Sequence, residues 1–191
     1  MQFQIYRARE NELIEGCRQK ERAAQKALYE HMAGKMFAIC CRYVKDRMEA
    51  EDVLVTSFTK VFERIGQFKN EGSFEGWVRK IIVNESLSYL RKNKSMYIET
   101  ELETAHHEPD LSRVDNHLEA EDLLKMVSEL PSGYRIVFNM YAVDGYSHKE
   151  IADYLGISEN TSKSQLSRAR SQLQSRLLEM EKFIQPKLKE Q

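Results

Sequence analysis

The 191-residue sequence has little proline, glycine or cysteine, with 3 Pro, 8 Gly and 3 Cys. Because proline and glycine are the strongest helix breakers, their scarcity leaves long stretches free to be helical. Cys40 and Cys41 are adjacent and Cys17 stands apart. This pattern fits neither a disulfide framework nor a zinc site, so we expect free thiols in a reducing compartment.

Long apolar runs and catalytic motifs are also missing. No stretch approaches the roughly 20 apolar residues of a membrane span, and the first residues lack the apolar run of a signal peptide. There is no phosphate-binding loop, nucleophile elbow or catalytic carboxylate pair, and the adjacent His106 and His107 have no suitably spaced third metal ligand. We therefore expect a cytoplasmic protein with no membrane insertion, no metal or cofactor, and no enzymatic activity.

Helical spacing of apolar residues is present throughout the first half of the chain. It predicts one helix over residues 21–45 and a second over residues 50–65, with Gly66 as its terminating glycine. Residues 67–72 form a predicted loop. Ser73 is expected to cap a third helix.

Charge is distributed unevenly although the net charge is only −1. Residues 60–94 hold eight basic and four acidic residues, whereas residues 93–130 hold ten acidic and three basic ones. We predict an all-α protein of two small helical domains joined by a flexible acidic linker. The predicted boundaries are 1–94, 95–116 and 117–191.

The second domain contains a pattern typical of a helix-turn-helix. Ser147 and Glu150 form a capping box, Gly156 supplies a turn, and Ser158 caps the next helix. On that helix one face is small, polar and cationic, which suits the major groove of DNA. This polar face consists of Asn160, Lys163, Ser164, Ser167, Arg168 and Ser171. The alternative interpretation is an ordinary αα-hairpin whose polar face is only solvated.

Two segments resemble regions two and four of bacterial sigma factors. Residues 50–94 read AEDVLVTSFTKVFERIGQFKNEGSFEGWVRKIIVNESLSYLRKNK, and residues 130–173 read LPSGYRIVFNMYAVDGYSHKEIADYLGISENTSKSQLSRARSQL. Their order and the absence of a middle domain resemble the extracytoplasmic-function group. The resemblance implies an initiation factor whose partners are core RNA polymerase, promoter DNA and an inhibitory anti-sigma factor.

For the first domain, the resemblance implies one helix that docks on core polymerase and carries Asp52, Leu54 and Phe58. Val55 and Thr56 depart from the Gln-Glu pair that is common there. The following loop and helix are implied to hold the melted minus-ten strand, and a net +4 patch with nearby aromatic rings suits a single strand. The implied residues are Phe68, Lys69, Asn70, Arg79, Lys80, Asn84, Ser88, Arg91 and Lys92.

Among the nearby rings, the apolar pattern favours core positions for Phe74 and Trp77, while Phe68 and Tyr89 are more open to direct contact. The basic run at residues 91–94 has a second interpretation, in which it only complements the helix dipole.

For the second domain, the resemblance implies contacts with minus-thirty-five DNA. Ser162 replaces a usual Val, and its hydroxyl is expected to bond back to the Ser158 carbonyl. Gln165 replaces a frequent Arg, which removes one expected phosphate contact. The implied contact residues are Asn160, Lys163, Ser164, Ser167, Arg168 and Arg170.

A simple regulator that binds duplex DNA without core polymerase is a second interpretation. It explains the helix-turn-helix but gives the basic, aromatic first domain no role. It also predicts tight promoter binding by the protein alone. An enzyme is the third class, and the missing catalytic motifs count against it.

Overall fold

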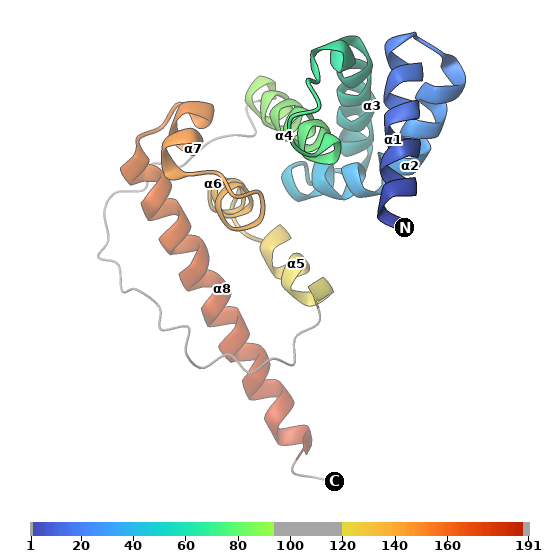
Figure 1. The fold of residues 1–191 in the computed structure, drawn as a ribbon. Helices are drawn as coiled ribbons and strands as arrows, with labels where there is room; N and C mark the ends of the chain where they lie inside the picture. Colours follow the sequence, from blue (N-terminus) through green and yellow to red (C-terminus); the bar gives the residue numbers. More distant parts are fainter. Residues whose placement is uncertain (1, 94–119, 189–191) are drawn as a thin grey trace. The chain divides into compact units, whose positions relative to one another are not determined.

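A computed structural model of the chain describes residues 2–93 and 120–188, which form two compact units. Every regular element within these ranges is helical, so the predicted all-α class with two helical domains is confirmed (Figure 1). The predicted acidic linker, residues 95–116, lies outside the described residues together with His106 and His107. None of the helices in the described ranges is both long enough and apolar enough to span a membrane.

Unit 1, residues 2–93, is a bundle of four α-helices with one short 3₁₀ turn (Figure 1). The three predicted helices are present, but the first helix was not predicted because its sequence has few apolar residues in a clear period. The elements are α1 (Gln2–Arg18), α2 (Arg22–Tyr43), α3 (Arg47–Arg64), η1 (Ile65–Gln67) and α4 (Phe74–Lys92).

The core of unit 1 centres on α2, which packs against α1, α3 and α4. Buried side chains recur along α2 every three or four residues, so they share one face of the helix. Each large apolar side chain buried in this way contributes about 1.5–3 kcal/mol. The fully buried side chains include Leu28, Met36 and Tyr43 of α2, Val61 of α3, and Val78, Ile82 and Leu87 of α4.

The ends of α3 differ from each other. At its start, Asp46 Oδ1 accepts a hydrogen bond from the Glu49 amide at 3.0 Å, which caps the helix. At its end, the chain tightens into η1, and Gly66 lies inside that turn without a positive φ. Gly66 therefore follows the end of the helix as predicted, but the chain leaves the helix through a 3₁₀ turn and not through a left-handed glycine.

Unit 2, residues 120–188, is organised along one long helix, α8, that runs beside the shorter ones (Figure 1). Pro131 is the N-cap residue of α6, where its missing N–H costs nothing. A π-helical turn follows α6 directly. The elements are α5 (Ala120–Ser128), α6 (Ser132–Phe138), the π-helix η2 (Asn139–Val143), α7 (His148–Leu155) and α8 (Glu159–Leu188).

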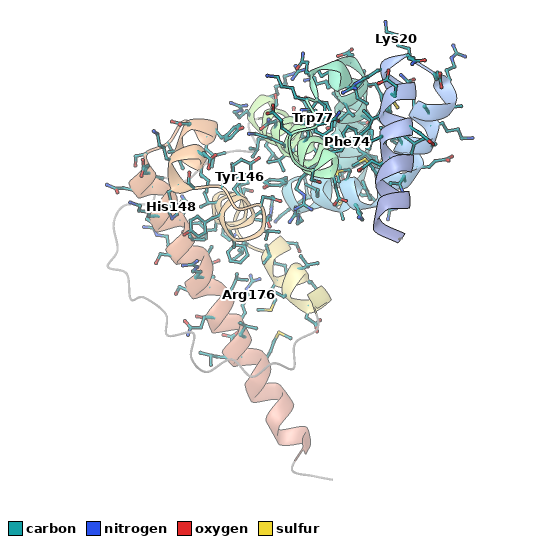
Figure 2. All side chains as sticks on the ribbon, viewed as in Figure 1. Lys20, Phe74, Trp77, Tyr146, His148 and Arg176 are labelled. Atoms are coloured by element: carbon teal, nitrogen blue, oxygen red, sulfur yellow. The ribbon has the colours of Figure 1, made fainter. Side chains whose placement is uncertain are left out.

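A core cluster joins the end of α5 to the middle of α8. Met126, Val127 and Leu130 pack with Ala169, Leu173 and Leu177. At the edge of this cluster, Arg176, which is labelled in Figure 2, donates from Nη1 to Glu129 Oε2 at 2.9 Å. The middle of α8 is therefore held against α5 and Leu130.

Candidate nucleic-acid interface

Helix α4 has one continuous polar face. Ser73 Oγ accepts a hydrogen bond from the Gly76 amide at 3.3 Å, so Ser73 caps this helix as predicted. In the described chain, the buried Oδ1 of Asn84 has no hydrogen-bond partner, so one acceptor on this face is unused. Positions three or four apart share a helix face. The side chains on it, exposed or half-buried, are Lys80, Asn84, Ser88 and Arg91.

Acidic residues pair with part of the predicted +4 patch. Lys60 Nζ lies 2.6 Å from Glu85 Oε2 in a half-buried pair that links α3 to α4. The Glu75 carboxylate forms two ion pairs, one with Lys35 Nζ at 3.0 Å and one with Arg79 Nη2 at 3.6 Å. Of the cations that the structure describes in this patch, Arg64 at the end of α3 is exposed, and the other exposed ones lie in the loop and along α4. Those of the loop and α4 are Lys69, Lys80, Arg91 and Lys92.

Three aromatic rings gather between the loop and the start of α4. The Phe68 ring centroid lies 5.1 Å from that of Phe74 and 5.7 Å from that of Trp77. Figure 2 labels Phe74 and Trp77, which lie beside each other on α4. Phe68 is only 6% exposed, which corrects the expectation that it is open to direct contact. Its neighbours bury it because the loop folds back onto α4.

Tyr89 is half-buried on α4 and so is more accessible than Phe68, while its direct contact with DNA stays a prediction. Burial, followed by a hydrogen bond to Glu49, raises the pKa of its phenol.

Helix α3 carries the residues implied to dock on polymerase, but two of them face inward. Leu54 is 5% and Phe58 is 2% exposed, whereas Asp52 is exposed. The first two side chains pack in the core of unit 1, which corrects the expectation that they lie on the docking surface. The exposed apolar residues of α3 are Met48, at 77%, and Val55, at 58%.

The helix-turn-helix of unit 2 forms as the sequence predicts. Ser147 Oγ accepts from the Glu150 amide at 3.2 Å, and the Ser147 amide donates to the Glu150 carboxylate at 2.9 Å. Gly156 ends α7 with a left-handed φ of 68°. The Thr161 amide then donates to Ser158 Oγ at 3.0 Å at the start of α8.

The first turns of α8 have opposite faces of different character. Leu166, Ala169 and Leu173 are buried, as predicted. Ser164 is half-buried, and its hydroxyl donates to the Thr161 carbonyl at 3.0 Å. The other residues implied for duplex recognition are exposed or half-buried. They are Asn160, Lys163, Ser167, Arg168 and Arg170.

Two residues of α8 have partners that differ from expectation. Ser162 Oγ lies 2.9 Å from His148 Nδ1, so the predicted bond from its hydroxyl to the Ser158 carbonyl was wrong. That carbonyl accepts from the Ser162 amide instead. Gln165 is only 3% exposed, and its Oε1 lies 3.0 Å from the place where a Cβ on Gly133 would stand. Gln165 therefore fills space that the glycine leaves in α6.

His148 also lies in a cluster that sequence reasoning missed. Its ring stacks on Tyr141 with centroids 4.5 Å apart, and the Arg170 guanidinium lies 5.8 Å from the Tyr141 centroid. Burial, followed by the charge of Lys163, lowers the pKa of His148. The residues come from η2, α7 and α8 and share no spacing that would have revealed them. The cluster joins the first helix of the motif, which carries the His148 labelled in Figure 2, to the second helix.

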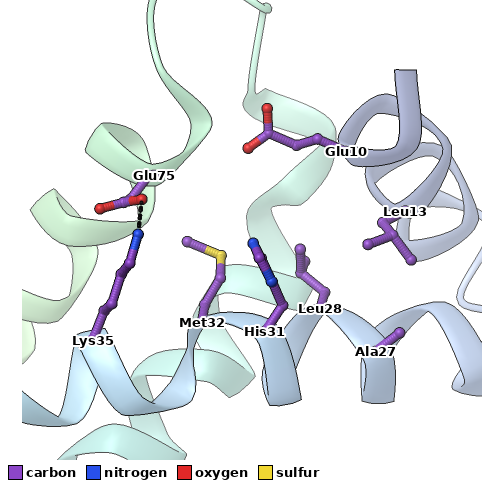
Figure 3. A pocket seen from close by; sticks show the side chains of 8 residues that line it. All are labelled: Glu10, Leu13, Ala27, Leu28, His31, Met32, Lys35 and Glu75. Atoms are coloured by element: carbon purple, nitrogen blue, oxygen red, sulfur yellow. Dashed lines mark hydrogen bonds and ion pairs between the residues drawn. The ribbon is translucent and has the colours of Figure 1, made fainter. Parts of the chain in front are cut away.

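Unit 1 contains a pocket of about 270 Å³ between α1, α2 and the start of α4. Figure 3 shows an apolar floor and a rim of mixed charge, with Lys35 and Glu75 paired at one end. A rim of mixed charge does not select one kind of ligand. The described residues hold no group of three or more His, Cys, Asp or Glu that could bind a metal. The pocket is lined by Glu10, Leu13, Ala27, Leu28, His31, Met32, Lys35 and Glu75.

The cysteines are free thiols, as expected. Burial raises the pKa of Cys17 to about 11 and that of Cys40 to about 12. Because the thiolate is the reactive form, neither buried thiol is suited to nucleophilic chemistry at neutral pH.

Comparison with known families assigns both units. Residues 28–96 match the family described as Sigma-70 region 2, and residues 120–173 match Sigma-70, region 4. The chain is 24% identical to the ECF RNA polymerase sigma-E factor of Haemophilus influenzae over 177 residues, which is 86% of this chain and 93% of that one. It is 23% identical to the RNA polymerase sigma-H factor of Pseudomonas aeruginosa, covering 95% of this chain and 96% of that one.

Among solved structures, the chain is similar to the sigma factor RpoE of Bartonella quintana in complex with the anti-sigma factor NepR. The sequence identity is 22%, the TM-score is 0.49, and the match covers 81% of this chain and 96% of that chain.

The helix-turn-helix and the two separate helical units define a class, the DNA-binding transcription factors of all-α architecture. The two family matches together span more than half of the 191 residues. The chain belongs to the sigma-70 family, in its extracytoplasmic-function group. It is accordingly a promoter-specific transcription initiation factor that works with RNA polymerase.

Proposed function

We propose that the two units divide promoter recognition between them, with unit 2 reading the minus-thirty-five duplex and unit 1 capturing the melted minus-ten strand. The observation that carries this proposal is the presence of two different polar surfaces on separately packed units. One is the outward face of α8, and the other combines α4 with the loop before it.

The outward face of α8 suits duplex DNA because its side chains are short or are cations on long stems. Ser164 and Ser167 leave room for the helix to approach base edges in the major groove. We assign a base contact to Arg168 and phosphate contacts to Lys163 and Arg170. Asn160 lies at the start of the helix, where a backbone contact is also expected.

The α4 surface suits a single strand. Its exposed cations can follow the sugar-phosphate backbone. The Oδ1 of the half-buried Asn84 is buried without a partner, and we propose that this side chain turns outward to bond an unpaired base. Ser88 lies four residues further along the same face. Since Phe68 is buried, we assign it to holding the loop and assign strand contact to Lys69 and Asn70.

Helix α3 is the proposed contact with core polymerase. Its exposed stripe has helical spacing and combines apolar and acidic groups. Exposed apolar side chains on one helix face suit docking on another protein. Leu54 and Phe58 contribute indirectly, because their burial fixes this helix in unit 1. The proposed stripe consists of Met48, Asp52, Val55 and Thr59.

The protein itself would supply no covalent chemistry, because binding energy for the unpaired strand drives the opening of DNA. We place it in the cytoplasm with the polymerase. An anti-sigma factor is the further partner that membership of this group implies, and we propose that it covers these same binding surfaces.

Reconstitution tests this function. The purified protein is mixed with bacterial core RNA polymerase and a pool of genomic fragments, and transcript starts are mapped. We expect defined starts that need both components, and these starts identify the promoter. Tight duplex binding by the protein alone, without polymerase association or new starts, would contradict the proposal and favour a simple regulator.

A further inference from the structure

The loop between η1 and α4 has a restrained base and an exposed tip. At the base, the Phe68 ring packs against Phe74 and Trp77, and its amide donates to the Ile65 carbonyl at 3.2 Å. Every residue from 69 to 73 is exposed. Asn70 has a φ of 58° in this tip, an uncommon left-handed conformation for a residue other than glycine. The loop therefore has a defined shape that its base must support.

Arg18, the last residue of α1, provides a second restraint on that base. Its Nη2 donates a hydrogen bond of 2.7 Å to the Phe68 carbonyl, across 50 positions of sequence. Its Nη1 pairs with Glu15 at 3.3 Å, and the side chain is 29% exposed. A hydrogen bond from a charged donor is stronger than one from a neutral donor. The side chain of Phe68 is thus held by rings, and its carbonyl by a guanidinium.

The placement of Arg18 follows from the close contact of α1 with α2. A Cβ on Gly16 would stand 2.7 Å from Ala24 Cβ, so only glycine permits this approach. Cys17 is 1% exposed beside it. Lys20 then turns the chain with a φ of 59°, at the connection labelled in Figure 2. These contacts fix the end of α1 and direct Arg18 toward the loop.

We propose that Arg18 is a positioning residue for minus-ten strand capture. By holding the Phe68 carbonyl, it presents the loop tip, and with it Lys69 and Asn70, to the unpaired strand in one arrangement. This inference rests on the proposed function. Neither family match assigns the role, because they cover residues 28–96 and 120–173, whereas Arg18 lies in α1.

The test compares Arg18→Met with Arg18→Gln, which loses the charge but keeps an N–H donor. Arg22→Met is the matched control, because it removes the same charge from an exposed neighbouring position. Each full-length variant is combined with core polymerase on the promoter found by reconstitution. Opening is followed by the reactivity of unpaired thymines, and occupancy of the minus-thirty-five duplex is measured in the same complexes.

We expect Arg18→Met to lower opening about tenfold or more, since a hydrogen bond to a charged group contributes about 1.5–3 kcal/mol. Occupancy of the minus-thirty-five duplex should stay at the wild-type level. Arg18→Gln should recover part of the opening, and Arg22→Met should resemble wild type.

Base discrimination separates positioning from a merely structural role. Opening is compared on the matched promoter and on promoters with single changes in the minus-ten segment. A misplaced loop lowers the ratio between them, whereas partial unfolding lowers both equally. An unchanged ratio in Arg18→Met, or wild-type opening by a folded Arg18→Met, would overturn the inference. If Arg18→Met does not fold, the same ratio is measured for Arg18→Gln, and an unchanged ratio in that variant would overturn the inference. Failure of the wild-type chain itself to open any promoter would instead remove the proposed function, and this inference with it.

Discussion

The helices α4 and α8 both present polar faces, but the two units build them differently. On α8 the recognition surface is one helix face, supported by the buried Leu166 and Ala169 and by a capped turn before it. On α4 the surface is a helix face joined to an exposed loop, and acidic residues of α4 pair with Lys60 of α3 and with Arg79. A duplex groove has a fixed shape that a preformed helix can fit. An unpaired strand needs a surface that contacts bases, backbone and rings together.

The largest expected effect comes from the core that supports α4. Leu87 is 1% exposed, so Leu87→Ala should lower the free energy of unfolding of unit 1 by about 2–5 kcal/mol. Trp77 belongs to α4 and is the sole tryptophan of the chain, so its fluorescence during denaturant unfolding reports on unit 1. Leu178→Ala is the control, because this leucine of α8 is 44% exposed. Equal shifts of the tryptophan transition in both variants would contradict the assignment of these residues.

Recognition by α8 should be sensitive to a single base contact. Arg168→Ala is expected to weaken binding to the minus-thirty-five duplex by about 1–3 kcal/mol and to relax its sequence preference. Lys163→Ala should weaken matched and altered sequences alike, since phosphate contacts carry no sequence information. Titration of labelled duplexes with the polymerase complex measures both. Loss of affinity by Arg168→Ala without any loss of preference would count against a base contact.

The turn that sets α7 and α8 in place depends on its caps. Ser147→Ala should lower the stability of unit 2 by about 1 kcal/mol. The substitution removes the Ser147 hydroxyl, which accepts a hydrogen bond from the Glu150 amide at 3.2 Å. Thermal unfolding followed by circular dichroism measures the loss. Ser147→Asp should retain the cap, and Ser171→Ala, on the exposed face of α8, should be neutral. A destabilising effect of Ser171→Ala as large as that of Ser147→Ala would refute the capping account.

The smallest expected effect is a pH dependence confined to unit 2. The folded pKa of His148 lies below its ordinary value of 6.5, chiefly through burial and then through Lys163. Glu159 opposes the shift, and Arg170 adds to it. Since the unfolded chain binds a proton more readily, stability should be full above pH 6.5 and should decline as pH falls through that value.

His148→Gln should remove this decline, and the His31→Gln control in unit 1 should keep it. Unfolding of unit 2 is measured by hydrogen exchange between pH 5.5 and pH 7.5, values chosen about one unit either side of 6.5. An unchanged pH profile in His148→Gln would assign the dependence to another group.

The sequence was informative wherever a local rule determines structure. The caps at Ser73, Ser147 and Ser158 and the left-handed turn at Gly156 were predicted correctly, since each depends on a few adjacent residues. The burial of Leu166, Ala169 and Leu173 was predicted from helical period alone. The family resemblance, which rested on both segments in order, was confirmed.

Contacts between distant segments were not predictable in this way. The partner of Ser162 is a histidine in another helix, and the partner of Arg18 is a carbonyl 50 positions away. Phe68 belongs to a loop by its neighbours in sequence, yet tertiary packing buries it. The docking role of α3 and the contacts of α4 and α8 with DNA stay predictions.

One measurement tests the division of labour most directly. Wild-type, Asn84→Ala and Arg168→Ala proteins are assembled with core polymerase on the same promoter, and each complex is scored for minus-thirty-five occupancy and for minus-ten opening. We predict that Asn84→Ala loses opening while keeping occupancy, and that Arg168→Ala loses occupancy first, with opening per bound complex near the wild-type value. Equal losses in both readings for both variants would contradict the account.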